Sequence, residues 1–367
     1  MVHSAAPDPE GVREGVERVL AEYLATQRSL YTSFGADGAP LADAVTAMLE
    51  RGKRLRPSFC YWSFRAHGGE AGSPEASGVL HVGAALELFQ AAALFHDDVM
   101  DASDTRRGRP TAHRAFAARH ASEGWTGDAD RFGESVAILL GDLALSASES
   151  EFAQAADGFA PEAAREARLV FDLMRTEVTV GQYLDVLAQA LPWGEDPAAD
   201  EARAREVIRA KSARYSVEHP IVLGAALAGA DDEALAAVRA VGLPLGEAFQ
   251  LRDDLLGVFG DPEVTGKPAG DDMREGKRTV LVARAMALAA PEDRALLAAQ
   301  LGDRALDADQ VAHLAGILQR CGAAAQVEEL IDDLVAQSLE RLDAADLTEP
   351  GASMLRRLAH AAATRAA

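Results

Sequence analysis

Two aspartate-rich clusters stand far apart in this chain, each inside an otherwise apolar stretch. The first reads His96-Asp97-Asp98-Val99-Met100-Asp101, and the second reads Gln250-Leu251-Arg252-Asp253-Asp254. Carboxylates on an apolar helix face are costly unless cations neutralise them. Oxygen clusters with open coordination positions suit Mg²⁺, which takes waters and substrate phosphates as its other ligands. The clusters therefore indicate metal-bound phosphate chemistry, and their apolar surroundings argue against ordinary surface acids.

The spacing within the clusters indicates which carboxylates act together. Asp97 and Asp101 are four residues apart, so on a helix they share a face with Cβ atoms about 5–6 Å apart. That separation lets the pair hold one or two Mg²⁺. Asp98 points about 100° away; it counts as a catalytic residue but is not assigned a metal. If the helices that carry the two clusters face each other, they close a cavity around a metal-bound diphosphate.

Basic residues accompany both clusters, as a diphosphate requires. The segment 51–57 carries four cations at a predicted helix start, where free backbone N–H groups also attract anions. Arg106 and Arg107 follow the first cluster, and Lys211, Lys267 and Lys277 surround the second. A solvated basic patch is the alternative, and it is less expected in an acidic protein.

Composition narrows the class of protein. The 367 residues carry a formal charge of −22, which argues against nucleic-acid binding because that needs a basic face. Two cysteines make no disulfide framework and fit a reducing cytoplasm. We expect no signal peptide and no transmembrane segment, because the first ten residues lack an apolar core and no apolar run reaches about 18 residues.

The elements that must position these residues are helices. Residues 1–7 are predicted to be disordered, and 8–367 to form one all-α domain, because no stretch shows a period-2 strand pattern. The first cluster lies in a helix over 79–102 that is apolar almost all round and hence buried. Later helices are expected at 161–191, 201–218, 220–229, 232–242 and 244–259, followed by a loop over 260–276.

Six ordered motifs together resemble one family. They are RGKRLRP at 51–57, HDDVMD…RRG at 96–108, GD at 141–142, GQYLD at 181–185, KSARY at 211–215 and FQLRDDLLGVFGD…GKPAGDD…GKRT across 249–279. The chain is similar to the trans-isoprenyl diphosphate synthases, the family of farnesyl and geranylgeranyl diphosphate synthases. The resemblance covers roughly residues 10–350. It implies an isoprenoid-synthase-type helical bundle around a central cavity, a homodimer, and the substrates isopentenyl diphosphate and an allylic diphosphate.

The resemblance also implies roles for individual residues. Three Mg²⁺ are expected, with Asp97, Asp101 and Asp253 as their ligands. The residues implied in catalysis are Asp97, Asp98, Asp101, Arg106, Lys211, Gln250, Asp253 and Lys267. Those implied in substrate binding are Lys53, Arg56, Gln90, Arg106, Arg107, Lys211, Ser212, Gln250, Lys267 and Lys277. Many relatives have His where Gln90 stands and Asp where Gly257 stands. The second departure makes the third metal depend on Asp253, with Gln250 and Asp254 as support.

In the implied reaction the allylic C–O bond breaks and leaves an allylic cation. The double bond of isopentenyl diphosphate attacks this cation, and the released diphosphate then removes a proton from the product. Water must be excluded, and the loop 260–276 is a candidate closing element. Two other classes remain open. A class I terpene cyclase needs no second diphosphate site, and a non-catalytic regulatory subunit would be expected to lose one aspartate cluster.

Product length depends on the residues before Asp97. In the resembling family, bulky aromatic residues four or five positions earlier limit the product to fifteen carbons. Here these positions are Ala93 and Ala92, and Phe89 follows one turn deeper. We therefore expect a twenty-carbon product, geranylgeranyl diphosphate, with longer polyprenyl and farnesyl diphosphates as alternatives.

Overall fold

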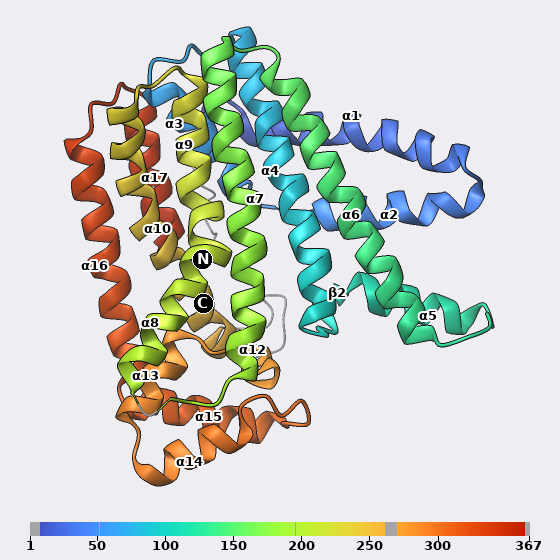
Figure 1. The fold of residues 1–367 in the computed structure, drawn as a ribbon, viewed down its shortest axis with the longest axis vertical. Coiled ribbons are helices and arrows are strands. Elements are labelled where there is room, and N and C mark those ends of the chain that lie inside the picture. Colours follow the sequence, from blue (N-terminus) through green and yellow to red (C-terminus); the bar gives the residue numbers. More distant parts are fainter. Residues whose placement is uncertain (1–7, 51, 195, 261–269, 364–367) are drawn as a thin grey trace. The chain divides into compact units, whose positions relative to one another are not determined.

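A computed structural model describes residues 8–50, 52–194, 196–260 and 270–363. Within this part the chain is almost entirely helical, and its strands form one pair of two residues each (Figure 1). The all-α prediction is confirmed. The predicted disorder of residues 1–7 lies outside the described residues.

The helices are α1 (Val12–Ser33), η1 (Ala36–Gly38), α2 (Ala39–Leu49), α3 (Leu55–Ala66), α4 (Pro74–Met100), α5 (Ala112–Ser122), α6 (Ala129–Ala156), α7 (Pro161–Ala190), α8 (Pro197–Val207), η2 (Ile208–Glu218), α9 (His219–Leu227), α10 (Asp232–Phe259), α12 (Asp271–Glu275), α13 (Val280–Leu288), α14 (Pro291–Gln300), α15 (Ala308–Arg320), α16 (Ala323–Ala344) and α17 (Gly351–Ala363). The strands are β1 (Thr105–Arg106) and β2 (Arg109–Pro110).

The chain divides into two compact units, and each is described by itself. Of the described residues, unit 1 holds those up to 170 together with 220–235 and 346–358, and unit 2 holds those within 171–219, 236–345 and 359–363. The first aspartate cluster belongs to unit 1 and the second to unit 2. A single domain over 8–367 stays a prediction.

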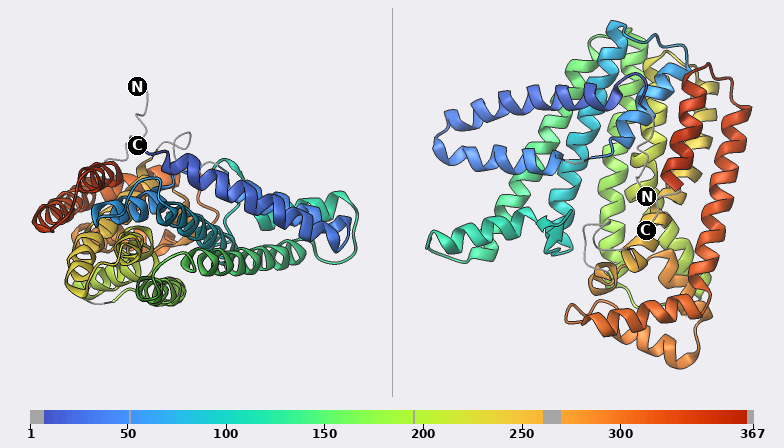
Figure 2. Two further views of the ribbon diagram at one scale, coloured as in Figure 1. Left: turned by 90° about the horizontal axis from the view of Figure 1, so that it is seen from above. Right: turned by 180° about the vertical axis from the view of Figure 1, so that it is seen from behind.

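Helix α4 is the centre of unit 1. It begins where the Ser73 side chain accepts a hydrogen bond from the Ala76 amide, with Pro74 in its first turn. Helices α1 and α2 run antiparallel (Figure 2), and together with α3 and α6 they pack on α4. Leu88, Ala92 and Phe95 bury one side of α4 in the resulting core. The cluster at 97–101 therefore ends a helix that is firmly held.

The apolar length of α4 also bears on membranes. Among the described residues, α4 is the helix long and apolar enough to cross a membrane, by length and composition. Its most apolar window is 67% buried inside the protein. A buried core helix of this length passes the same test, so the feature is weak evidence for a membrane span.

Helix α10 differs from the sequence prediction. A break was predicted at Pro244, but α10 runs continuously from Asp232 to Phe259. Proline removes the amide that would bond the carbonyl four residues earlier. Here that carbonyl, on Ala240, accepts a hydrogen bond from Arg341 Nη1 at 2.7 Å, and the Ser338 hydroxyl donates to the Val241 carbonyl at 2.9 Å. Helix α16 thus supplies partners that keep the helix intact, and the predicted break is wrong.

The segment η2 is a second difference. Residues 208–218 were expected to be α-helical, but they form a π-helix that follows α8 directly. Since π-helical turns are rare and cluster at functional sites, the geometry is notable in a segment that carries Lys211 and Ser212.

Candidate active site

In unit 1, the carboxylates of the first cluster differ in their surroundings. The Asp98 side chain is 1% exposed, and its Oδ1 accepts hydrogen bonds from Arg106, at 2.7 Å from Nε and 2.6 Å from Nη2. Arg106 Nη2 also lies 3.5 Å from Asp97 Oδ2. Asp101 is only 4% exposed and caps the end of α4. One guanidinium therefore neutralises Asp98 and adjoins Asp97, so Asp98 helps to position the arginine.

A tight β-hairpin positions Arg106. In the β1–β2 pair, Arg106 is opposite Arg109, and the two-residue loop consists of Arg107 and Gly108. Both loop residues have positive φ, 53° and 74°, as a type I′ turn requires. The turn leads the chain back toward the end of α4, which explains why two arginines and a glycine follow the aspartates.

Arg107 is held by backbone oxygens. Its Nη1 donates to the Glu50 carbonyl at 2.8 Å. Burial lowers the pKa of Arg107, nearby Arg106, Arg54 and Arg56 lower it further, and Glu87 opposes them. Four arginines from two segments, 54–56 and 106–107, therefore come close enough to repel one another, which favours binding of a polyvalent anion.

The cations at 53–56 have unequal roles. Arg54 is 6% exposed and pairs with the buried Glu87 at 2.5 Å, and its Nη2 donates to the Leu49 carbonyl at 2.6 Å. This arginine therefore fastens α3 to α4. Lys53 is exposed, and Arg56 and Gln90 are half-buried, as a binding role for these three residues requires. Sequence reasoning missed Glu87, although a lone acid in an apolar helix was a signal for a buried partner.

In unit 2, α7 and η2 place Lys211. Its Nζ lies 2.6 Å from Asp185 Oδ2. Gly181 lies one turn before Asp185 on α7 and close to the η2 backbone. A Cβ added to Gly181 would lie 2.3 Å from the backbone nitrogen of Lys211. Glycine at 181 therefore permits the close approach, and Asp185 directs the ammonium group of Lys211. These contacts explain the glycine and the aspartate of the GQYLD motif.

Helix α10 contacts η2 in the same way. An added Cβ at Gly246 would lie 2.3 Å from the Ala213 carbonyl oxygen. One turn later, the Ser212 hydroxyl donates to Gln250 Oε1, and Gln250 Nε2 donates to Asp254 Oδ1 at 2.8 Å. Ser212 and Gln250 thus connect the π-helix to the second aspartate pair.

The second cluster contains an acid that the motif did not predict. Burial raises the pKa of Asp254 to about 7, the Gln250 hydrogen bond and Lys277 lower it, and the charges of Asp272 and Asp253 raise it. Asp272, on α12, thus belongs to this group of carboxylates. Lys277 Nζ lies 3.6 Å from Asp272 Oδ1 and 2.9 Å from Glu275 Oε2.

Some predicted site residues are not described. Lys267 lies outside the described residues, as does most of the loop 260–276 that was expected to close the site. In the described part of this loop, α12 covers Asp271–Glu275.

The donor set fits Mg²⁺ that arrives with a diphosphate. No group of three or more His, Cys, Asp or Glu side chains within 8–50, 52–194, 196–260 and 270–363 forms a complete metal site. Each of the two clusters offers carboxylates next to cations instead. Magnesium retains waters and takes phosphate oxygens, so incomplete protein ligation suits it.

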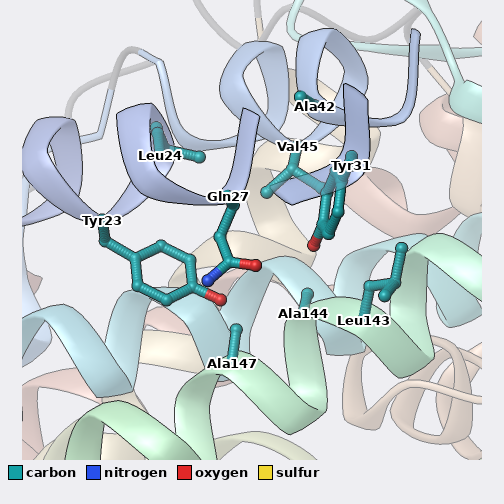
Figure 3. Close-up of a pocket in the computed structure, with 9 residues that line it drawn as sticks. All are labelled: Tyr23, Leu24, Gln27, Tyr31, Ala42, Val45, Leu143, Ala144 and Ala147. Carbon is teal, nitrogen blue, oxygen red and sulfur yellow. The ribbon is translucent and has the colours of Figure 1, made fainter. Parts of the chain in front are cut away.

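A small cleft in unit 1 is separate from these residues. Tyr23, Gln27 and Tyr31 of α1 line it together with α2 and α6 (Figure 3), and it is too narrow to hold a water molecule. Burial, together with the neighbouring Tyr31 and Glu151, raises the pKa of Tyr23. The cleft is therefore a packing feature and contains no predicted site residue.

An all-helical chain with two carboxylate clusters, each beside cations, defines the class of helical enzymes that act on metal-bound diphosphates. The chain belongs to the polyprenyl synthetase family, whose model matches residues 39–318, and is a prenyltransferase.

Relatives support this assignment. The short chain isoprenyl diphosphate synthase of Methanothermobacter thermautotrophicus is 33% identical over 292 residues, 80% of each chain. The geranylgeranyl diphosphate synthase of Mycobacterium tuberculosis is 32% identical over 305 residues, 82% of this chain and 77% of the relative. The crystal structure of geranylgeranyl pyrophosphate synthase from Corynebacterium glutamicum, complexed with isoprenyl diphosphate and magnesium, is 38% identical. It matches with a TM-score of 0.90, over 98% of this chain and all of that one.

Proposed function

We propose that this protein condenses isopentenyl diphosphate with an allylic diphosphate in a Mg²⁺-dependent reaction and makes geranylgeranyl diphosphate. The observation that carries the proposal is the end of α4, where Arg106 adjoins Asp97 and Asp98, and where the next residue, Arg107, neighbours three further arginines. Carboxylates for metals and cations for phosphate oxygens occur there together. The relatives' names support the same activity.

The roles follow from the described contacts. Lys211, held by Asp185, and Arg106 bind the allylic diphosphate, and Lys267 is assigned there from its motif. Lys53, Arg56, Arg107 and Gln90 bind isopentenyl diphosphate, and Lys277 completes the cations. Asp97, Asp101 and Asp253 would hold three Mg²⁺, which when bound would supply charge stabilisation to the leaving diphosphate.

The chain's own residues then need only orient, neutralise and exclude water. When the allylic C–O bond breaks, its electron pair goes to the diphosphate and leaves a carbocation. The double bond of isopentenyl diphosphate forms the new C–C bond, and the proton lost afterwards passes to the released diphosphate. Charge-assisted donors that face the leaving group supply the main stabilisation.

The experiment is incubation with labelled isopentenyl diphosphate plus dimethylallyl, geranyl or farnesyl diphosphate and Mg²⁺, with product sizing. We expect twenty-carbon diphosphate. Hydrocarbon release from the allylic substrate alone would indicate a terpene cyclase, and the absence of turnover a regulatory subunit. Asp97→Ala and Asp253→Ala should each lose more than ~100-fold in rate. Asp104→Ala is the matched control, since its side chain is 77% exposed, and it should keep its rate.

The sequence alone proposes that Ala92 and Phe89 form the floor of the product cavity; from the packing of α4 we propose Ala93 in place of Ala92. Ala92 packs in the core with Leu88 and Phe95, and Phe89 is buried but is not part of that core cluster. Phe89 and Ala93 precede Asp97 by eight and four residues, so the three share one face of α4. We place the growing chain along this face, with Phe89 about 12 Å of helix rise from Asp97.

Two variants test this assignment through product size. Ala93→Phe should shorten the product and Phe89→Ala should lengthen it. Ala92→Phe should destabilise the fold by about 1–3 kcal/mol through overpacking. A wild-type enzyme that stops at fifteen carbons would contradict the placement.

The proposed enzyme is a homodimer in the cytoplasm. Large apolar side chains are exposed on α6 in unit 1 (Ile138, Leu139, Leu145) and on the unit 2 part of α7 (Leu173, Val180, Tyr183, Val186). Exposed apolar patches mark interaction surfaces. In light scattering, Val180→Glu should shift the protein toward the monomer mass, whereas the control Leu288→Glu on α13 should leave the dimer intact.

A further inference from the structure

Thr111 stands at the start of α5 without capping that helix. It occupies the N-cap position, where a threonine hydroxyl ordinarily accepts a hydrogen bond from an amide of the first turn. The Thr111 side chain makes no such capping bond. Thr111 is nevertheless only 2% exposed. Because a buried hydroxyl needs a partner, its hydroxyl must serve another contact.

That contact closes the base of the β1–β2 hairpin. The Thr111 hydroxyl donates to the Ser103 carbonyl at 2.8 Å, and the Thr111 amide donates to the Asp104 carbonyl at 3.0 Å. The Ser103 amide in turn donates to the Asp98 carbonyl at 3.0 Å, in the last turn of α4. Thr111 therefore ties the residue after the hairpin to the two residues before it, and Ser103 ties both to α4.

A buried histidine on α5 holds the hydroxyl in this orientation. His113 is 4% exposed, and its Nδ1 lies 3.1 Å from Thr111 Oγ1. A hydroxyl has one proton, and the Ser103 carbonyl takes it, so His113 Nδ1 carries a proton and donates to Thr111. Within the part of the chain that the structure describes, Nε2 of the same ring is buried and has no hydrogen-bond partner. The bond to Thr111 is therefore the polar contact that orients this ring.

The hairpin that these contacts close carries Arg106 and Arg107. Arg106 also fastens the hairpin through Asp98, but a bound phosphate competes for the same guanidinium. The contacts of Thr111 use no substrate-binding atom, so they hold the hairpin whether or not Arg106 is engaged. We propose that Thr111 and His113 are positioning residues that hold the arginine hairpin against the end of α4 for diphosphate binding. This inference rests on the proposed function.

The kinetic test removes the hydroxyl and then restores it. Thr111→Val keeps the shape without the hydroxyl, so kcat/KM should fall ~10-fold or more for both diphosphates, because a misplacement of about 1 Å can cost on the order of 100-fold. Thr111→Ser keeps the hydroxyl and should keep most of the wild-type kcat/KM. His113→Phe keeps a ring without the donor and should resemble Thr111→Val. His120→Gln is the matched control: this histidine is also buried on α5, but its ring contacts the Thr126 carbonyl at 3.2 Å, so both KM values should stay unchanged.

A second measurement is independent of turnover. In hydrogen–deuterium exchange, the peptide spanning 103–111 should exchange faster in Thr111→Val than in the wild type, and the peptides of α6 should not change. If the wild type shows no turnover, the proposed function fails, and the exchange rates still decide whether Thr111 holds the hairpin.

The positioning role is overturned if the wild type is active and Thr111→Val matches it in kcat/KM. A slower Thr111→Val enzyme with wild-type exchange in 103–111 would also overturn it, since Thr111 would then act otherwise than by holding the hairpin. An equal loss in Thr111→Ser would do the same, because the hydroxyl would then not be the group that matters.

Discussion

Gly181→Ala should separate the positioning of Lys211 from its chemistry, because it changes neither the charge nor the substrate contacts. An alanine Cβ at 181 would lie 2.3 Å from the Lys211 nitrogen and 2.6 Å from both the Ala210 carbonyl carbon and the Lys211 Cα. All three are backbone atoms, so no side chain can rotate away. Helix α7 and the π-helix must therefore move apart.

The size of the movement follows from these distances. Ordinary van der Waals contact begins at 3.4 Å, so the backbone nitrogen of Lys211 must move about 1.1 Å away from the new Cβ. A misplacement of about 1 Å can cost on the order of 100-fold in rate. Overpacking costs about 1–3 kcal/mol, and the better helix propensity of alanine returns about 1 kcal/mol. We expect a folded but slow enzyme.

The assay is initial-rate kinetics with each diphosphate varied in turn, supported by thermal unfolding followed by circular dichroism. The kcat/KM for the allylic diphosphate should fall about 100-fold, while the KM for isopentenyl diphosphate changes little. Gly316→Ala on α15 is the control, because its Cβ meets only the flexible end of the Arg320 side chain, 2.8 Å away. It should gain slightly in stability and keep its rates.

A folded Gly181→Ala enzyme with wild-type kcat/KM would show that the close approach of α7 to η2 does not position Lys211. If the variant fails to fold, Asp185→Asn provides the second test. It removes the charge 2.6 Å from Lys211 Nζ while keeping the shape of the side chain. Wild-type use of the allylic substrate by that variant would refute the positioning role of α7.

Three further predictions concern stability and reactivity. Glu87→Leu leaves the buried Arg54 without the Glu87 carboxylate, so it should lower the free energy of unfolding in urea by about 3–5 kcal/mol. The double variant Glu87→Leu/Arg54→Met should lose clearly less stability. Equal losses in the two variants would show that the pair is not coupled. Cys60 is fully buried and burial raises its thiol pKa, whereas Cys321 is half-buried, so a thiol reagent should label only Cys321 until the protein unfolds. Burial lowers the pKa of His67 below its usual 6.5, although the hydrogen bond to the Ser63 carbonyl opposes this shift. Below pH 6.5 the unfolded chain therefore binds a proton at His67 more readily than the folded protein does. The free energy of unfolding should consequently decrease as the pH falls below 6.5. His67→Gln should therefore flatten the pH dependence of the unfolding free energy in that range, by at most about 1.4 kcal/mol per pH unit, and an unchanged slope would contradict the prediction.

The spacing of residues close in sequence predicted much of the fold and the candidate residues of the site. Helical periodicity and the absence of strand patterns predicted the all-α class, and Pro161 correctly marked the start of α7. The four-residue separation of Asp97 and Asp101 predicted a shared helical face; in the structure Asp97 lies in the last turn of α4 and Asp101 caps the end of that helix. These features depend on residues within a turn or two of one another, and the geometry of a helix converts such spacing directly into position.

Features that depend on contacts between distant segments needed the structure. The sequence predicted a break at Pro244, because it could not show that Arg341 would bond the freed Ala240 carbonyl. It also predicted an ordinary helix where η2 is π-helical.

The sequence by itself determined which residues could hold a diphosphate: two aspartate clusters, the cations after them, and the spacing that puts each set on one helix. Only the tertiary structure decided that Arg54 is buried against Glu87, whereas Lys53 is exposed and Arg56 half-buried. It also decided that the Asp272 carboxylate lies against α10 at Gly257. The reason is physical. Helical position follows from a regular local geometry, but the partner of a buried charge is set by packing between helices that are distant in sequence.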